Sequence, residues 1–241
     1  SQTPGAGSAI ASSAFQLSSS ETNYVYAGSY VTGRWTGELE AFAISASGTL
    51  ASNPTWTAQA QLDALANRNG RTAPASGVTS PQCGAEYSNC NDERQVYFMH
   101  PSTKALTAFT YPALQAAGLD GDGKFSTACS ASRLSQCSSL TADQKTLANT
   151  GKHLVNFLRG DATYETTNGS NPLFRLRHSA LGDIANGTPA FAGKPPFQYT
   201  DAGYSDFVAA QASRTKVVYV AANDGMLHAF NASTGKELWA F

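Results

Sequence analysis

Residues 217–241 decide the fold, and they read VVYVAANDGMLHAFNASTGKELWAF. Val217–Val220 is rich in β-branched and aromatic residues, which favour a strand. Asn223-Asp224-Gly225 supplies residues that tolerate the positive φ of a tight hairpin turn, so 226–230 is predicted to be the returning strand. A Thr-Gly turn then leads into a third predicted strand at 237–241. Strand, turn, strand, turn, strand is an antiparallel meander, the unit of a β-propeller blade.

Part of this segment occurs three times along the chain. The tetrapeptide Leu-x-Ala-Phe stands at residues 39–42, 106–109 and 227–230, and the Val-Tyr pairs that precede it stand at 25–26, 96–97 and 218–219. Recurrence of one supersecondary unit predicts a radial repeat architecture, with long insertions between the copies. The sequence therefore predicts a mainly β fold in which the three tetrapeptides are strands of successive meanders.

Composition narrows the classes of partner. Charged residues make up 14% of the 241 residues and the formal net charge is -1, which gives no electrostatic reason to expect nucleic acid or an anionic membrane as partner. No apolar run approaches the roughly 20 residues of a membrane span. Residues 1–20 are rich in Ser, Ala, Gly and Gln and are expected to be a linker or chain edge. Because the last meander stops in mid-blade, residues 21–241 are expected to be the N-terminal half of a propeller in a longer protein.

Four cysteines lie in two close pairs, Cys83 with Cys90 and Cys129 with Cys137. Zinc sites usually use two-residue gaps and further Cys or His ligands nearby, which these pairs lack. We predict two local disulfides, Cys83–Cys90 and Cys129–Cys137, and hence an oxidising compartment. Four free thiols in a cytosolic protein are the alternative, and the sequence alone permits three pairings.

Residues 141–159 are predicted to form one long helix inside an insertion. Thr141 and Gln144 have the spacing of a capping box, apolar residues recur on one face at helical spacing, and Gly160 follows as a left-handed cap. The tripeptide Arg159-Gly160-Asp161 at this helix end is also the one that integrins recognise in extracellular adhesins. The structural alternative is that Arg159 favours the helix C-terminus and Gly160 ends the helix.

The segment 120–126, DGDGKFS, resembles the middle of a calcium loop. Asp120, Asp122, the Lys124 carbonyl and Ser126 would be its ligands, with Gly123 at the sharp turn. Carboxylates are missing at the first and last positions of the loop, and calcium takes six to eight oxygens. An ordinary Asp-Gly turn is the alternative.

No catalytic constellation stands out in the sequence. The four histidines, at 100, 153, 178 and 228, lie in unrelated contexts, and a structural role is expected for each. The chain shows no nucleophile elbow, phosphate loop or zinc motif. We therefore predict that it is not an enzyme.

Four blocks of sequence resemble one known family. They are WTGELEAF, LVNFLRGD, RHSALGDI and VYVAANDGMLHAF, at residues 35–42, 154–161, 177–184 and 218–230. They look like the PilY/PilC family of type IV pilus biogenesis factors and tip adhesins, in the first half of its C-terminal propeller. This resemblance implies a modified quinoprotein-like β-propeller that is secreted and carried on the bacterial cell surface, outer membrane or pilus tip. It also implies promotion of pilus assembly, opposition to retraction and adhesion to host cells or surfaces. The implied partners are pilus subunits or minor pilins, the other half of the propeller and a host receptor such as an integrin, with calcium as candidate cofactor.

Two other classes share parts of this pattern. Residues 223–239 also resemble the repeat of quinoprotein dehydrogenases, which oxidise alcohols with a bound quinone and calcium. Such enzymes carry the repeat many times, whereas here it is clear once and no adjacent Cys-Cys pair is present, so no quinone is expected. A non-catalytic propeller scaffold for outer-membrane assembly is the third interpretation.

Overall fold

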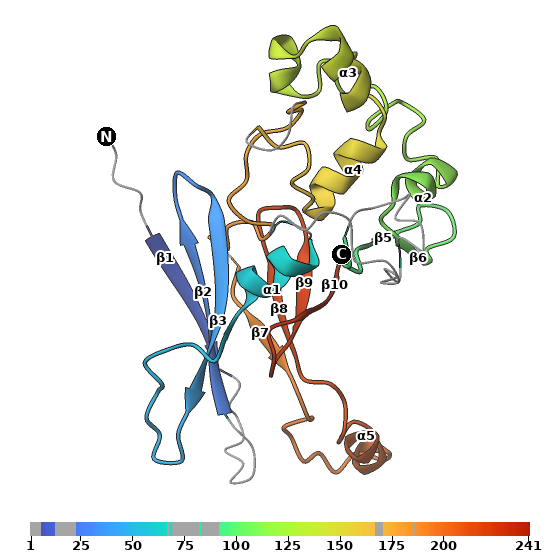
Figure 1. Cartoon of the computed structure of the whole chain (residues 1–241). Coiled ribbons are helices and arrows are strands. Elements are labelled where there is room, and N and C mark those ends of the chain that lie inside the picture. The colour runs from blue at the N-terminus through green and yellow to red at the C-terminus, as the bar shows by residue number, and fades with distance from the viewer. Residues whose placement is uncertain are drawn as a thin grey trace, which may run out of the picture. The chain divides into compact units, whose positions relative to one another are not determined.

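The computed structural model describes residues 6–12, 23–66, 68, 82, 92–166, 171–185 and 187–241 (Figure 1). The chain divides into two compact units. Unit 1 comprises Ser1–Gln61 and Gly182–Leu238, and unit 2 comprises Leu62–Leu181 and Trp239–Phe241.

Two four-stranded antiparallel sheets carry the first and third copies of the repeat. Their strand orders are β1(Ala6–Ser12)-β2(Asn23–Val31)-β3(Thr36–Ile44)-β4(Trp56–Thr57) and β10(Glu237–Ala240)-β9(Leu227–Asn231)-β8(Val217–Ala221)-β7(Ala190–Ala192). The second copy forms a two-stranded hairpin of β5(Tyr97–Met99) and β6(Leu106–Ala108). Each four-stranded sheet has the strand number of a propeller blade, and the predicted fold class is confirmed.

The three copies share one register. Tyr26 lies opposite Ala41, Tyr97 opposite Ala108, and Tyr219 opposite Ala229. A slip of one residue would turn every side chain to the other face of the sheet. The shared register therefore means that equivalent residues of the repeat lie opposite each other in all three copies. This shared pairing explains why Val-Tyr and Leu-x-Ala-Phe recur together.

The first strand corrects one expectation. Ala6–Ser12, inside the stretch expected to be linker, pairs antiparallel with β2 from Ala6 opposite Val31 to Ser12 opposite Val25. Strand pairing uses main-chain groups that every residue except proline supplies. A segment of Ala, Ser and Gly is therefore able to join a free strand edge although its composition is that of a linker.

The two sheets of unit 1 pack through aromatic side chains. The Tyr26 ring is stacked on that of Phe191, with centroids 5.8 Å apart, and contacts Trp56 at 5.9 Å. The Tyr26 hydroxyl and the Trp56 indole N–H both donate to the Ala232 carbonyl, at 3.1 and 3.0 Å. A Cβ atom on Gly235 would lie 2.4 Å from the Trp56 ring, so this glycine is required for close packing. A single buried carbonyl thus joins two rings of one sheet to the other sheet.

The described part of unit 2 is mostly helical and irregular. Besides the β5–β6 hairpin it holds α2(Tyr111–Ala116), a 3-10 helix at Ser135–Ser139, α3(Ala142–Ala148) and α4(Lys152–Arg159). Its apolar core gathers buried residues from the disulfide loop, from both of these later helices and from the chain beyond them: Ala128, Cys129, Cys137, Ala148, Leu154, Leu173 and Phe174. The other helices among the described residues are α1(Ala58–Leu65), whose sequence crosses from unit 1 into unit 2, and α5(Tyr204–Ala210) in unit 1.

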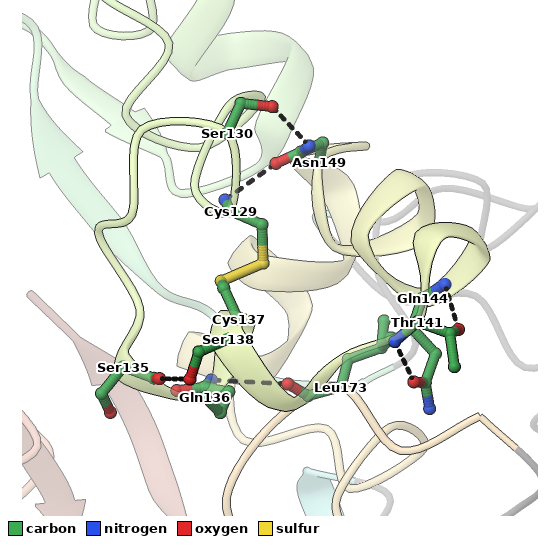
Figure 2. Close-up of a disulfide and its surroundings, with 10 residues drawn as sticks. All are labelled: Cys129, Ser130, Ser135, Gln136, Cys137, Ser138, Thr141, Gln144, Asn149 and Leu173. Carbon is green, nitrogen blue, oxygen red and sulfur yellow. Dashed lines mark hydrogen bonds between the residues drawn. A yellow bond between two sulfur atoms is a disulfide. The ribbon is translucent and has the colours of Figure 1, made fainter.

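The prediction of one helix across 141–159 is wrong in one respect, because the helix is broken at Asn149–Gly151. The capping box of Thr141 and Gln144 is present as predicted. Gly151, however, has φ +71°, and a Cβ atom there would lie 2.3 Å from the Tyr111 ring. The Asn149 side chain bonds outside the helix, accepting from the Cys129 amide at 2.9 Å and donating to Ser130 at 2.9 Å (Figure 2). These contacts end α3 and restart the chain as α4 in a new direction.

The Cys129–Cys137 disulfide is present as predicted (Figure 2). Cys83 and Cys90 lie outside the described residues, and their pairing stays a prediction. Across the part of the chain that the structure describes, none of the helices has the length and apolarity to cross a membrane.

Candidate functional site

The end of α4 brings together the residues of the Arg-Gly-Asp tripeptide. Gly160 has φ +119° and ends the helix in the left-handed region, as predicted. A Cβ atom there would lie 2.8 Å from the Ala66 Cβ and 3.2 Å from the Ala180 Cβ. Both the backbone conformation and the available space therefore require glycine at this position.

Arg159 is fully buried and forms an ion pair. Its guanidinium donates to both Asp92 oxygens, at 2.7 and 2.6 Å, in the bidentate geometry that favours Arg over Lys. The same group donates to the carbonyls of Phe109 and Arg94, at 3.0 and 2.8 Å. A buried charge is tolerated only when it is paired and hydrogen-bonded, and Arg159 meets both conditions inside unit 2.

Asp161 is 4% exposed and is also bonded internally. One carboxylate oxygen accepts from the Thr163 amide at 2.9 Å and from the Thr163 hydroxyl at 2.6 Å. Recognition by an integrin-type receptor needs an exposed carboxylate. The observed geometry therefore supports the structural interpretation of the tripeptide, in which Arg159, Gly160 and Asp161 hold the end of α4.

A second buried ion cluster fixes the chain after Gly160. Arg68 donates to both oxygens of Glu165, at 2.7 and 3.0 Å, and to the Gly160 carbonyl at 2.9 Å. The Arg177 side chain donates to Oε1 of Glu165 at 2.9 Å, the same oxygen that accepts from Arg68 Nη1. Burial by itself would raise the pKa of Glu165, but the hydrogen bonds from the Arg68 guanidinium and the Arg177 backbone amide, together with the positive charges of both arginines, hold this pKa below its usual value. The carboxylate therefore stays ionised and keeps the helix end in place.

The predicted calcium loop folds as a turn that bonds to itself. Asp120 accepts from the amides of Phe125 and Ser126, at 2.7 and 3.3 Å, and from the Tyr111 hydroxyl at 3.1 Å. Burial acts to raise the pKa of Asp120, yet these hydrogen bonds lower it below the ordinary value. Asp122 instead faces two cations, Lys124 at 3.7 Å and Arg133 at 3.8 Å. Among the described residues no three His, Cys, Asp or Glu side chains are grouped to hold a metal ion, and calcium at this loop stays a prediction.

A buried histidine organises unit 1. His228, on β9, has its Nδ1 2.8 Å from Glu237 and its Nε2 3.0 Å from Asp224. Burial alone would lower the pKa of His228, but hydrogen bonds to Asp224 and Glu237 raise it to about 9. The imidazole is therefore protonated at neutral pH and bridges two carboxylates. It is fully buried, which matches the structural role expected for it.

Asp224 extends this cluster to the Leu-Gly-Asp turn of another resemblance block. It accepts from the Gly182 amide at 3.0 Å, and the neighbouring Asn223 side chain donates to Asp183 at 2.6 Å. A Cβ atom on Gly182 would lie 2.4 Å from the Asp224 amide nitrogen. Two sequence blocks that lie about 40 residues apart are thus one structural unit.

Sequence reasoning missed the partners in both charge clusters. Asp92 lies 67 residues from Arg159, and Glu165 lies 97 residues from Arg68. No local spacing rule links positions so far apart. One feature of the sequence could have pointed to these residues, namely that charged residues are few, at 14% of the chain. In such a chain, a charged residue within an apolar stretch is a candidate for burial in an ion pair.

Comparison with known proteins agrees with the resemblance. Residues 181–239 match the family model of the PilY1 beta-propeller domain. A type IV pilus biogenesis factor PilY1 homolog of Xylella fastidiosa (strain Temecula1) is 46% identical over 106 residues, which cover 41% of this chain and 8% of that protein. The type IV pilus biogenesis factor PilY1 of Pseudomonas aeruginosa (strain PAK) is 30% identical over 230 residues. That alignment covers 91% of this chain but 16% of the relative, so the chain spans a small part of its relatives' length. No solved structure gives a significant match.

Proposed function

Because this chain is a relative of the PilY1 type IV pilus biogenesis factors, we propose that it is a propeller segment of a pilus-tip or cell-surface protein that promotes pilus assembly. The observation that carries the proposal is the 30% identity to Pseudomonas aeruginosa PilY1 across 91% of the chain. The blade-like sheets with a shared register supply a scaffold of the kind that the family's propeller domain requires. Opposition to retraction and adhesion to host cells or surfaces are the finer parts of the proposal.

A segment exchange tests the role in assembly. The part of Pseudomonas aeruginosa PilY1 that aligns with this chain is replaced by this chain, and pilin sheared from the cell surface is quantified. We expect surface pili to be restored relative to a strain that lacks the gene. A Gly235→Val variant, which drives a side chain into Trp56, should lose this activity, while the exposed Leu50→Ala control keeps it. A secreted exchange protein that restores no pili would contradict the proposal.

A strain that also lacks the retraction motor separates assembly from retraction. If the segment acts only by opposing retraction, the strain without the retraction motor makes surface pili even when the exchange protein is absent. If this strain makes surface pili only when the exchange protein is present, the segment acts in assembly itself. Partners among pilus subunits or minor pilins are expected in either case.

We assign no adhesive role to the Arg-Gly-Asp tripeptide as it is folded here, since Arg159 and Asp161 are buried. Asp161→Glu tests this assignment. We expect it to lower the melting temperature and to leave attachment to integrin-coated surfaces unchanged after correction for the amount of folded protein. Loss of attachment at an unchanged melting temperature would show that the tripeptide is adhesive.

Calcium at residues 120–126 is a separate proposal. To bind, the ion would have to displace Lys124 and Arg133 from Asp122 and recruit oxygens from water or other residues. Calorimetric titration with calcium, with Asp122→Asn as test and the exposed Asp143→Asn as control, decides the matter. Heat that disappears only in Asp122→Asn would support the site, and no heat in the parent protein would exclude it.

Catalysis is not part of the proposal. The relatives are named as biogenesis factors, and the histidine in the strongest quinoprotein-like segment is buried between two carboxylates. Alcohol oxidation with added quinone and calcium is expected to stay at the level of buffer alone. Turnover above that level would support the dehydrogenase interpretation instead.

The location on the cell surface, outer membrane or pilus tip follows from the proposed role and is testable by protease treatment of intact cells.

A further inference from the structure

Unit 1 exposes a row of aromatic rings on the connection between β7 and β8. Four side chains, here called the aromatic ladder, follow one another in contact: Phe197, Tyr199, Tyr204 and Phe207. The ring centroids lie 5.4 Å apart for the first pair, 5.0 Å for the second and 5.8 Å for the third. Phe197, Tyr199 and Phe207 are 58%, 55% and 46% exposed. Single exposed apolar residues are ordinary, but a contiguous exposed group marks an interaction site.

The ladder is held in shape by its own backbone. The Tyr204 amide donates to the Asp201 carbonyl at 3.1 Å, and Gly203 has φ +84°, which turns the chain so that Tyr204 meets Tyr199 edge to face. The Phe207 amide then donates to the Gly203 carbonyl at 3.1 Å as α5 begins. At the base of the connection, the Arg214 side chain donates to the Gly193 carbonyl. Figure 1 shows α5 beyond the ends of β7 and β8. The arrangement is therefore organised before any partner arrives.

The charged side chains within the ladder segment itself are acidic. Residues 195–213 contain Asp201 and Asp206 and no Lys or Arg, whereas Lys194, Arg214 and Lys216 flank this segment in sequence. Both carboxylates are exposed, and neither forms an ion pair with any described residue. The faces of the aromatic rings attract cations as well. Rings and carboxylates therefore favour the same kind of partner.

We propose that the aromatic ladder, with Asp201 and Asp206, is a docking surface for an arginine-bearing segment of a partner protein. A guanidinium group is planar, stacks on aromatic faces and bonds to carboxylates through two N–H groups at once. Arginine therefore satisfies rings and carboxylates together, which a compact lysine ammonium does less well. The inference does not depend on the proposed role in pilus assembly.

Other occupants fit less well. A neutral apolar partner would strip water from two carboxylates without replacing it, which is costly. A second copy of this chain, packed on the same patch by two-fold symmetry, would place Asp201 and Asp206 near their own copies. Anionic lipid or nucleic acid would meet like charge. Charge complementarity thus selects a basic protein segment.

Fluorescence anisotropy with labelled short peptides tests the proposal. The probes are peptides of alternating arginine and glycine, of lysine and glycine, and of glutamate and glycine. We expect the arginine peptide to bind most tightly, the lysine peptide more weakly and the glutamate peptide not at all. Loss of one ring in Tyr199→Ala or Phe207→Ala should weaken arginine-peptide binding about threefold, as expected for an exposed cation–π contact. Asp201→Asn combined with Asp206→Asn should weaken it about fivefold at low salt and less at high salt.

Matched controls make the result decisive. Trp35→Ala removes an aromatic ring that is 60% exposed elsewhere in unit 1, and Asp143→Asn removes an exposed acid on α3. Both should leave binding unchanged, and all variants should keep the parent melting temperature because the altered side chains are exposed. Equal weakening by the controls, or equal binding of the glutamate peptide, would overturn the proposal. Self-association in sedimentation that disappears in Phe207→Ala, without peptide binding, would assign the ladder to a second copy instead.

Discussion

Arg159 shows that a tripeptide known for recognition is built here into the interior. Its guanidinium donates to Asp92, to the Gln82 side-chain oxygen and to two backbone carbonyls. A buried ion pair adds little stability over well-packed apolar residues, but the loss of one partner leaves the other charge buried and is strongly destabilising. In both charge clusters, the substitution of one residue therefore leaves the charge of its partner buried and unpaired. The loss of stability in such single variants shows that the buried pair is present.

Arg159→Ala is expected to lower the free energy of unfolding by about 3–5 kcal/mol, because it removes the cation that faces the buried Asp92 carboxylate. Urea denaturation followed by fluorescence measures the change. The matched control is Arg175→Ala, which removes an exposed arginine and should change stability by less than about 0.5 kcal/mol. Similar effects of the two variants would show that Arg159 is not buried as described.

His228 gives a pH dependence with a defined sign. Its folded-state pKa, about 9, lies above the unfolded value of 6.5, so the folded protein binds the proton more tightly. The stabilisation is fully present below about pH 6.5, declines between pH 6.5 and 9, and is lost above pH 9. Melting temperatures across this range should therefore fall more steeply for the parent than for His228→Gln. The exposed His178→Gln should follow the parent, and a His228→Gln curve parallel to the parent would contradict the assignment.

At the scale of elements, the strands of the repeat could be predicted from sequence, because β-branched and aromatic residues, turn residues and a fixed pairing all act within a few residues. The break at Gly151 could not, since it depends on Tyr111 and on the hydrogen bond that the Cys129 amide donates to the Asn149 side chain. The charge clusters depend on partners that folding alone brings together. β1 was missed because its pairing uses backbone groups that carry no sequence signal.

The disulfide loop is the element whose contribution to stability is easiest to isolate. Cys129 and Cys137 are eight residues apart, and closing so short a loop removes unfolded-state entropy worth about 2–3 kcal/mol. Cys129→Ser combined with Cys137→Ser should lower the free energy of unfolding of unit 2 by about that amount. Asn149→Ala, which keeps the disulfide but removes the bonds to Cys129 and Ser130, should cost less. A parent protein that releases thiol at this pair on unfolding without reductant would refute the bridge and weaken the expectation of an oxidising compartment.

At the scale of the molecule, the Ala232 carbonyl links the two sheets of unit 1. Trp56→Phe and Tyr26→Phe each remove one of its two donors, so each should cost about 1 kcal/mol. The double variant should cost more than the sum, because the buried carbonyl then has no donor left and pays the full desolvation penalty of about 1–3 kcal/mol. Chemical denaturation of the four proteins gives the coupling, and the exposed Trp35→Phe serves as control. Strict additivity would mean that water reaches the carbonyl.

Residues 62–181, which make up most of unit 2, lie within the sequence of unit 1, and this has a mechanical consequence. Residues 62–181 interrupt unit 1 in sequence, and the ends of this stretch lie side by side, because the Asp63 carboxylate accepts from the Ala180 amide at 2.7 Å. Tension applied at Asn23 and Lys236 is resisted first by the contacts within unit 1 and reaches unit 2 after those contacts rupture. Single-molecule pulling between these two residues should therefore show unit 1 extending first and unit 2 second, and the reverse order would contradict this inference. Force along the chain would thus leave residues 62–181 folded until the sheets of unit 1 give way.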